Sequence, residues 1–110
     1  MAYDESLAAR IRDELAPHGY VTERKMFGGL AFMVAGNMCC GVTDSDLMLR
    51  LGAHGADAAL DQPHVRPMDF TGRPLSGFVY VAPQATATAP DLRRWLGSAL
   101  VFVSTLPPKS

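Results

Sequence analysis

The chain has 110 residues, which is enough for one domain with its own hydrophobic core. Ten basic and eleven acidic residues give a formal net charge of −1, and the arginines and lysines are scattered along the chain. This distribution argues against direct nucleic-acid binding, which requires a basic patch, and no apolar run reaches the roughly 20 residues of a membrane span.

The N-terminal residues predict a helix followed by an outer strand. Asp4 can cap the helix, and its apolar residues recur at helical spacing: Leu7, Ala8, Ile11 and Leu15. Pro17 and Gly19 end the helix. Residues 21–26, VTERKM, alternate weakly between apolar and polar types, as in a strand at the edge of a sheet.

The most informative stretch is RKMFGGLAFMVAGNMCCGV, from Arg24 to Val42. Two short apolar runs, residues 30–35 and 38–42, are joined by Gly36-Asn37, which predicts a β-hairpin because both residues tolerate positive φ. Strand alternation should place Leu30, Phe32 and Val34 on one face and Ala31, Met33 and Ala35 on the other. Both faces are apolar. The second face is therefore covered by helices, partly covered with small residues, or paired with a second copy of the protein.

The middle of the chain predicts further strands around a short helix. Residues 44–46 form a turn, and in the strand 47–51 the three leucines point inward while Met48 and Arg50 point the other way. The remaining elements are expected in this order: a helix at 53–60, a loop at 62–67, a short strand at 68–70, a turn at 71–74, a strand at 77–82 and a flexible connector at 82–89.

The C-terminal helix has the clearest pattern. Thr88 and Asp91 fit a capping box, and Pro90 suits the first turn. One apolar stripe follows, made of Leu92, Leu96, Ala99, Val103 and Leu106, with Trp95 and Phe102 beside it as candidates for exposed aromatic residues. Pro107-Pro108 ends the helix.

These elements predict an α+β domain spanning residues 1–110, in the order α-β-β-β-β-α-β-β-α. The antiparallel sheet should have about five strands, and the N-terminal helix and the long C-terminal helix should pack on it in two layers. The position of the strand 77–82 in the sheet is not predictable from the sequence.

Three blocks together carry a family resemblance: RKMFGGLAFMVAGNMCCGV, DLMLRLG and MDFTGRPLSGFVYV. The chain resembles the N-terminal domain of the TfoX/Sxy family of bacterial competence regulators. The resemblance implies a two-layer α+β fold and a regulatory role linked to transcription. The longer regulators carry a second, C-terminal domain, whereas this sequence stops at Ser110. We therefore expect a stand-alone copy, which argues against a direct role in competence.

Most of the candidate binding residues lie in the stretch from Arg24 to Val42, and two further arginines lie beyond it. Arg24 and Arg50 interrupt apolar strands and are expected to lie near one another as an anion or carboxylate site, and Arg73 lies in the family-like TGRP turn. The alternative is a structural role for these guanidinium groups. The other candidates are Lys25, Phe27, Gly28, Gly29 and Cys39. The glycine pair fits a tight turn better than a phosphate loop, because a strand follows it where a phosphate loop requires a helix.

The adjacent residues Cys39 and Cys40 should point to opposite faces of their strand, so they cannot easily chelate one metal ion together. Cys40 should share a side with Met38 and Val42 and be buried in the core, whereas Cys39 should be more accessible. With no signal peptide at the N-terminus, the two thiols predict a protein of the reducing cytoplasm.

No catalytic constellation, glycine-rich cofactor loop or metal-ligand spacing is recognisable, and His18, His54 and His64 lie far apart. We expect no cofactor, no metal ion and no enzymatic activity. The leading hypothesis is a regulatory or protein-interaction domain, a homodimer with an unidentified protein partner. The alternative is a small-ligand or anion-binding domain, or a minor enzyme, that uses Arg24, Arg50, Arg73 and Cys39.

Overall fold

The computed structural model describes residues 3–26, 28–70 and 72–108. Its elements are α1 (Glu5–Leu15), β1 (Val21–Met26), β2 (Gly29–Val34), β3 (Asn37–Thr43), β4 (Asp46–Arg50), α2 (Gly52–Ala59), β5 (Val65–Phe70), β6 (Arg73–Val81) and α3 (Ala89–Val103), with short 3-10 helices at Ala16–His18 and Pro83–Ala85. The predicted α+β fold and element order are confirmed. The sheet has six strands, one more than the five expected.

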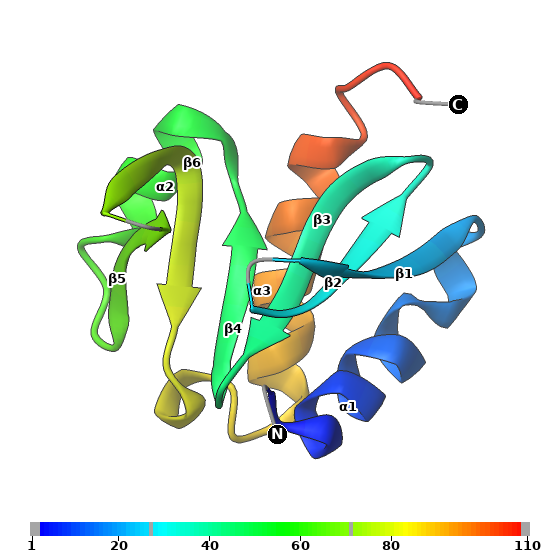
Figure 1. Ribbon diagram of the computed structural model, residues 1–110, viewed down its shortest axis with the longest axis horizontal. Coiled ribbons are helices and arrows are strands. Elements are labelled where there is room, and N and C mark those ends of the chain that lie inside the picture. The colour runs from blue at the N-terminus through cyan, green and yellow to red at the C-terminus, as the bar shows by residue number, and fades with distance from the viewer. Residues whose placement is uncertain (1–2, 27, 71, 109–110) are drawn as a thin grey trace.

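The sheet is antiparallel, with the strand order β1-β2-β3-β4-β6-β5. The first four strands pair in sequence, and β6 pairs with β4 before β5 closes the far edge. In Figure 1, α3 lies behind the strands with α1 next to it, and α2 packs beside β6. All three helices contribute to a common core on this side of the sheet, so the domain has the expected two layers.

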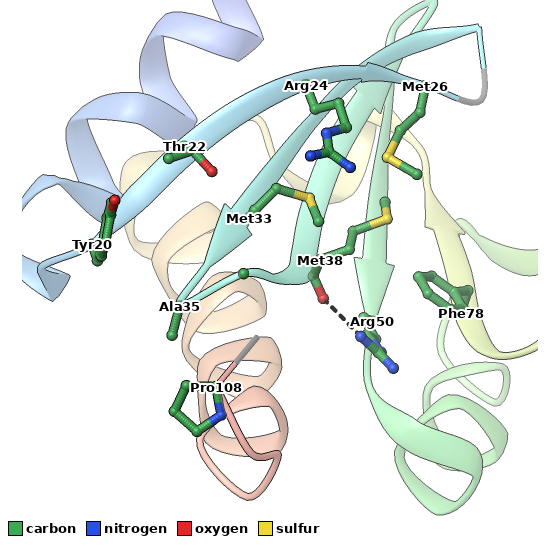
Figure 2. A pocket seen from close by; sticks show the side chains of 11 residues that line it. Tyr20, Thr22, Arg24, Met26, Met33, Ala35, Met38, Arg50, Phe78 and Pro108 are labelled. Atoms are coloured by element: carbon green, nitrogen blue, oxygen red, sulfur yellow. Dashed lines mark hydrogen bonds between the residues drawn. The ribbon is translucent and has the colours of Figure 1, made fainter. Parts of the chain in front are cut away.

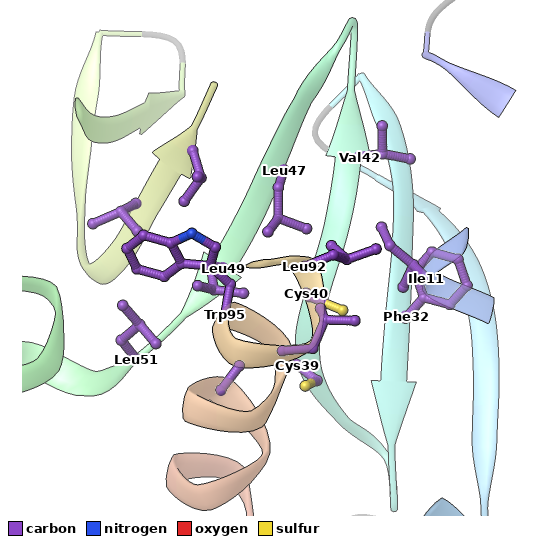
Figure 3. Close-up of a cluster of buried hydrophobic side chains, with 14 of the residues drawn as sticks. Ile11, Phe32, Cys39, Cys40, Val42, Leu47, Leu49, Leu51, Leu92 and Trp95 are labelled. Atoms are coloured by element: carbon purple, nitrogen blue, oxygen red, sulfur yellow. The ribbon is translucent and has the colours of Figure 1, made fainter. Parts of the chain in front are cut away.

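Side-chain caps start the two longer helices. The Asp4 carboxylate accepts hydrogen bonds from the backbone N–H groups of Ser6 and Leu7, and the Thr88 hydroxyl accepts one from Asp91 at 3.2 Å. Trp95 of α3 is only 3% exposed, so the expectation of an exposed aromatic residue there is wrong. Its indole packs among leucines of the sheet and of α3 (Figure 3), because the apolar face of α3 is wider than one stripe.

The hairpin between β2 and β3 turns one residue earlier than predicted. Ala35 and Gly36 occupy the turn with φ of 51° and 83°, as a primed two-residue turn requires. Asn37 is instead the first residue of β3 and is buried. Its side-chain amide donates a hydrogen bond to the Pro107 carbonyl at 2.9 Å, so it holds the tail that follows α3 against the sheet.

A β-bulge in β3 changes the predicted direction of its side chains. Phe32 pairs with Cys40 and Met33 with Met38, which leaves Cys39 as an extra residue between two paired positions. Cys39 and Cys40 therefore both lie in the helix-side core with no exposed surface (Figure 3). Met38 lies on the opposite face. The predicted accessibility of Cys39 and the shared side of Cys40 and Met38 are both wrong, because simple alternation fails at a bulge.

We expect the stability of the protein to fall in alkaline solution because of Cys40. A hydrogen bond with Cys39 and full burial raise the pKa of the Cys40 thiol well above its ordinary value. Because the folded pKa is the higher one, this contribution is fully present below the unfolded thiol pKa of about 8.5 and is lost at higher pH, by up to about 1.4 kcal/mol per pH unit. Urea unfolding between pH 7 and 10.5 measures the slope. The Cys40→Ala variant, although less stable overall, should show a shallower slope, and equal slopes would contradict the assignment.

Three further boundaries differ from the sequence prediction. β5 begins at Val65, inside the predicted loop, and β6 begins at Arg73, inside the turn predicted at 71–74; Thr71 lies outside the described residues. The long pairing of these two strands overrides the weak local pattern. The segment predicted to be a flexible connector is packed, because Thr86 is 2% exposed and its carbonyl accepts a hydrogen bond from Arg10 at 2.6 Å. The third boundary is the end of α3, which ends at Val103, whereas the predicted helical stripe continued to Leu106.

The face of the sheet opposite the helices is rich in methionine, and we call it the methionine face. It has a small buried cluster with half-buried residues packed around it: Ala31, Met38, Met48 and Met68, then Met26, Met33, Leu75, Phe78 and Tyr80. Five of the six methionines of the chain lie there. None of the described helices packs on this face, so the expectation of helices on both faces of the sheet is wrong for the described part of the chain.

Candidate functional site

A pocket of about 790 Å³ opens on the methionine face, at the end of the sheet near β1 (Figure 2). Its lining residues come from β1 to β4, β6 and the C-terminal tail: Tyr20, Thr22, Arg24, Met26, Met33, Ala35, Gly36, Met38, Arg50, Phe78 and Pro108. The volume is in the range of small-molecule sites, which usually combine an apolar lining with a few polar groups.

Strand alternation in β1 turns Thr22, Arg24 and Met26 toward the pocket. Glu23 points to the other side of the strand, where its carboxylate pairs with Arg12 of α1. Lys25 follows the same alternation and is absent from the pocket lining. The strand therefore presents one guanidinium group to the pocket and a separate ion pair to the helix layer.

Arg50 enters the pocket from the end of β4 and is positioned by two aromatic rings. Its guanidinium carbon lies 5.6 Å from the ring centre of Phe78 on β6 and 5.7 Å from that of Phe102 on α3. One of its nitrogens also donates to the Met38 carbonyl at 3.4 Å (Figure 2). A guanidinium group has five N–H donors, so most of the donors of Arg50 are not used by this contact.

Arg24 and Arg50 line the same pocket from opposite walls. They lie on β1 and β4, so β2 and β3 run between them, and strand spacing places the two backbones roughly 14 Å apart in a flat sheet. Met33 of β2 pairs with Met38 of β3, and both side chains lie between the two arginines (Figure 2). The two guanidinium groups therefore mark two ends of one pocket with thioethers between them, rather than one compact anion site.

Neither of these two arginines has an acidic partner in the described part of the chain. The ion pairs there join Arg12 to Glu23, Arg66 to Asp46, Arg93 to Glu14 and Arg94 to Asp91. The described lining residues of the pocket include no carboxylate, so their charge favours an anion. The alternative for these arginines was a structural role, through acidic residues or backbone carbonyls. Within residues 3–26, 28–70 and 72–108 no carboxylate pairs with Arg24 or Arg50, whereas Arg50 does donate to the Met38 carbonyl.

The other predicted binding residues are not brought into this pocket. Gly28 has a φ of 74° in the turn before β2, and a Cβ atom on Gly29 would lie 2.0 Å from the Val42 carbonyl oxygen. Both glycines thus have backbone reasons to be glycine, as expected for a tight turn. Cys39 is buried on the opposite face of the sheet. Phe27 and the side chain of Arg73 lie outside the described residues.

The sequence interpretation missed most of the pocket lining. Met26, Met33 and Met38 contribute thioethers, Phe78 contributes an aromatic ring, and Tyr20 stands at the pocket with 78% of its surface exposed. The concentration of methionines in predicted strands was the available indication, because methionine adapts to irregular and binding surfaces. The contribution of Pro108 could not be inferred, since it depends on the hydrogen bond from Asn37 to the tail.

Other chemistry was sought across the described residues. The three histidines are exposed and lie on separate elements, and no group of three or more histidine, cysteine or acidic side chains is arranged to hold a metal ion in that part of the chain. None of the helices in the described ranges is long and apolar enough to cross a membrane.

Comparison with known protein families identifies the chain. The sequence profile of the TfoX N-terminal domain matches residues 13–103, which include every strand of the described sheet, all of α3 and only the last turn of α1. No curated protein and no solved structure matches the chain significantly. The family match covers the three sequence blocks discussed above as well as the pocket residues Arg24 and Arg50. The chain therefore belongs to the TfoX N-terminal domain family.

Proposed function

We propose that this domain is a non-enzymatic regulatory domain that binds a small acidic molecule in the pocket of the methionine face. One observation carries the proposal. Among the described residues the same pocket contains two arginines without acidic partners, Arg24 and Arg50, and an apolar lining of thioethers and the Phe78 ring. Binding of this kind would make the domain a sensor within a regulatory pathway, in keeping with the regulatory role that its membership of the TfoX N-terminal domain family suggests.

The chemistry of the lining supports binding over catalysis. Besides the two arginines, the polar side chains among the described lining residues are the Thr22 hydroxyl and the Tyr20 phenol. A hydroxyl nucleophile needs a neighbouring general base, and none of the described lining residues is a histidine or a carboxylate that could serve as one. Guanidinium groups, in contrast, recognise carboxylates and phosphates through paired hydrogen bonds without any reaction.

The test uses protein labelled with ¹³C in the methionine methyl groups and titrated with small carboxylates, phosphate esters and nucleotides. The methyl signals of Met26, Met33 and Met38 report on the pocket, whereas Met68, buried on the same face but not lining the pocket, serves as the internal control. We expect saturable shifts of the three pocket signals with at least one anion, and loss of these shifts in Arg50→Met. A panel in which no anion moves the pocket signals would contradict the proposal.

A second proposal is that the domain forms a homodimer through β1. This strand is at the edge of the sheet and pairs only with β2, so its outer backbone groups are available to another strand. The opposite edge is less suitable, because β5 contains Pro67 and a shift in register. Native mass spectrometry at several protein concentrations measures the association. A monomer mass throughout the micromolar range would contradict the homodimer.

A further inference from the structure

We infer that the ligand of this pocket is an elongated dicarboxylate: a small molecule with an acidic group at each end of an apolar segment. This inference rests on the proposed function and specifies the ligand class of the same site. It follows from where the two positive charges lie relative to each other and from what lies between them.

The first end of the ligand is set by Arg50. Its guanidinium group contacts the rings of Phe78 and Phe102, from two different elements. It also donates a hydrogen bond to the Met38 carbonyl. A guanidinium that is held in this way loses little conformational freedom when it binds. Its remaining planar donors match the two oxygens of a carboxylate.

The second end is set by Arg24, on the opposite wall. Its strand is three strand spacings from that of Arg50, and Met33 and Met38 lie between the two side chains (Figure 2), so the arrangement favours two separate acidic groups over one small anion such as inorganic phosphate. Arg24 is exposed and has no acidic partner among the described residues. A ligand with a single acidic group would leave one of the two positive charges unmatched.

The segment between the two ends is apolar. Met33 and Met38 lie between the arginines, with Met26 and Phe78 beside them (Figure 2). Thioether side chains are flexible and polarizable, so they can close around an aliphatic chain without a fixed shape. Three neighbouring thioethers could also suggest a soft metal ion such as Cu(I). The positively charged guanidinium groups at both walls would repel a metal cation, and they favour an anion.

Isothermal titration calorimetry with four matched probes tests the inference: sebacate, decanoate, 1,10-decanediol and succinate. Sebacate and decanoate have chains of equal length and differ by one carboxylate, decanediol has no charge, and succinate has both charges but a short spacer. We expect sebacate to bind about ten-fold or more tightly than each of the other three, since each charge-assisted contact contributes to affinity. A series of dicarboxylates from four to twelve carbons should show a length optimum.

Two variants of β1 provide the decisive comparison. Arg24→Met should reduce sebacate affinity to about that of decanoate, a loss of about ten-fold or more, because one charged end loses its partner. Lys25→Met removes the neighbouring positive charge from the other face of the same strand and should leave sebacate affinity unchanged. Circular dichroism checks that both variants are folded, and the aliphatic Met side chain preserves the volume at each position.

The outcomes separate this inference from the proposed function. If the pocket methionines respond to other anions but sebacate binds no more tightly than decanoate, the dicarboxylate class is wrong and ligand binding stands. Equal loss in Arg24→Met and Lys25→Met also overturns the inference, because it would indicate a general charge effect. If only a peptide with two acidic side chains binds, the occupant is a protein partner and the small-molecule class is wrong.

Discussion

Replacing Gly29 with alanine is expected to destabilise the protein by about 3 kcal/mol or more, at the upper end of overpacking effects. The new Cβ atom would lie 2.0 Å from the carbonyl oxygen of Val42 and 2.9 Å from its carbonyl carbon. Both atoms belong to the backbone of β3, so no side-chain rotation can relieve the contact. β2 and β3 would have to separate at the end where β2 begins.

Gly28→Ala is the matched control, because it adds the same methyl group one residue earlier. Gly28 has a φ of 74°, and no heavy atom lies within 4 Å of the position that its Cβ would take. The cost should therefore be limited to the left-handed backbone conformation, about 1–2 kcal/mol. Urea unfolding followed by Trp95 fluorescence measures both free energies. Equal losses would mean that the close approach of β2 and β3 at Gly29 is not rigid.

This pair of variants also decides between the two interpretations of the Gly-Gly motif. A phosphate loop uses glycines so that backbone N–H groups can approach an anion. In this protein the second glycine instead allows two strands of the central sheet to approach each other. The motif therefore stabilises the hairpin that carries Met33 and Met38 into the pocket, and its effect on binding is indirect.

The sequence predicted what depends on local patterns. The helical stripe of α1, the caps Asp4 and Thr88, the edge position of β1 and the element order all follow from spacing and from residue type, and the structure agrees with them. The order of β4, β6 and β5 in the sheet depends on pairings between distant segments, which no local pattern encodes.

The candidate site shows the same division. Arg24 and Arg50 could be singled out because charged residues within apolar strands are unusual, and alternation placed Arg50 with Met48. The predicted role of Cys39 depended on alternation through β3, and one bulged residue reversed the direction of its side chain. Because a bulge is a property of two paired strands, the sequence of β3 alone could not indicate it.

Phe32→Ala is expected to lower the free energy of unfolding by about 3–5 kcal/mol, the usual cost of deleting a buried aromatic side chain. Phe32 has no exposed surface and lies in the helix-side core close to Ile11 of α1 (Figure 3). Its loss would leave a cavity between β2 and α1. Few substitutions in this chain remove more buried apolar volume.

Met33→Ala, at the next position of the same strand, should cost only about 1 kcal/mol, because Met33 is half-buried at the wall of an open pocket and its loss enlarges that pocket instead of creating a closed cavity. Urea unfolding gives both values under identical conditions. A large loss for Met33→Ala with a small one for Phe32→Ala would reverse the assignment of the two faces. The expected contrast would instead mean that the two faces of the sheet have separate roles. The helix-side core supplies most of the stability of the fold, which leaves the methionine face free to vary its side chains for a ligand.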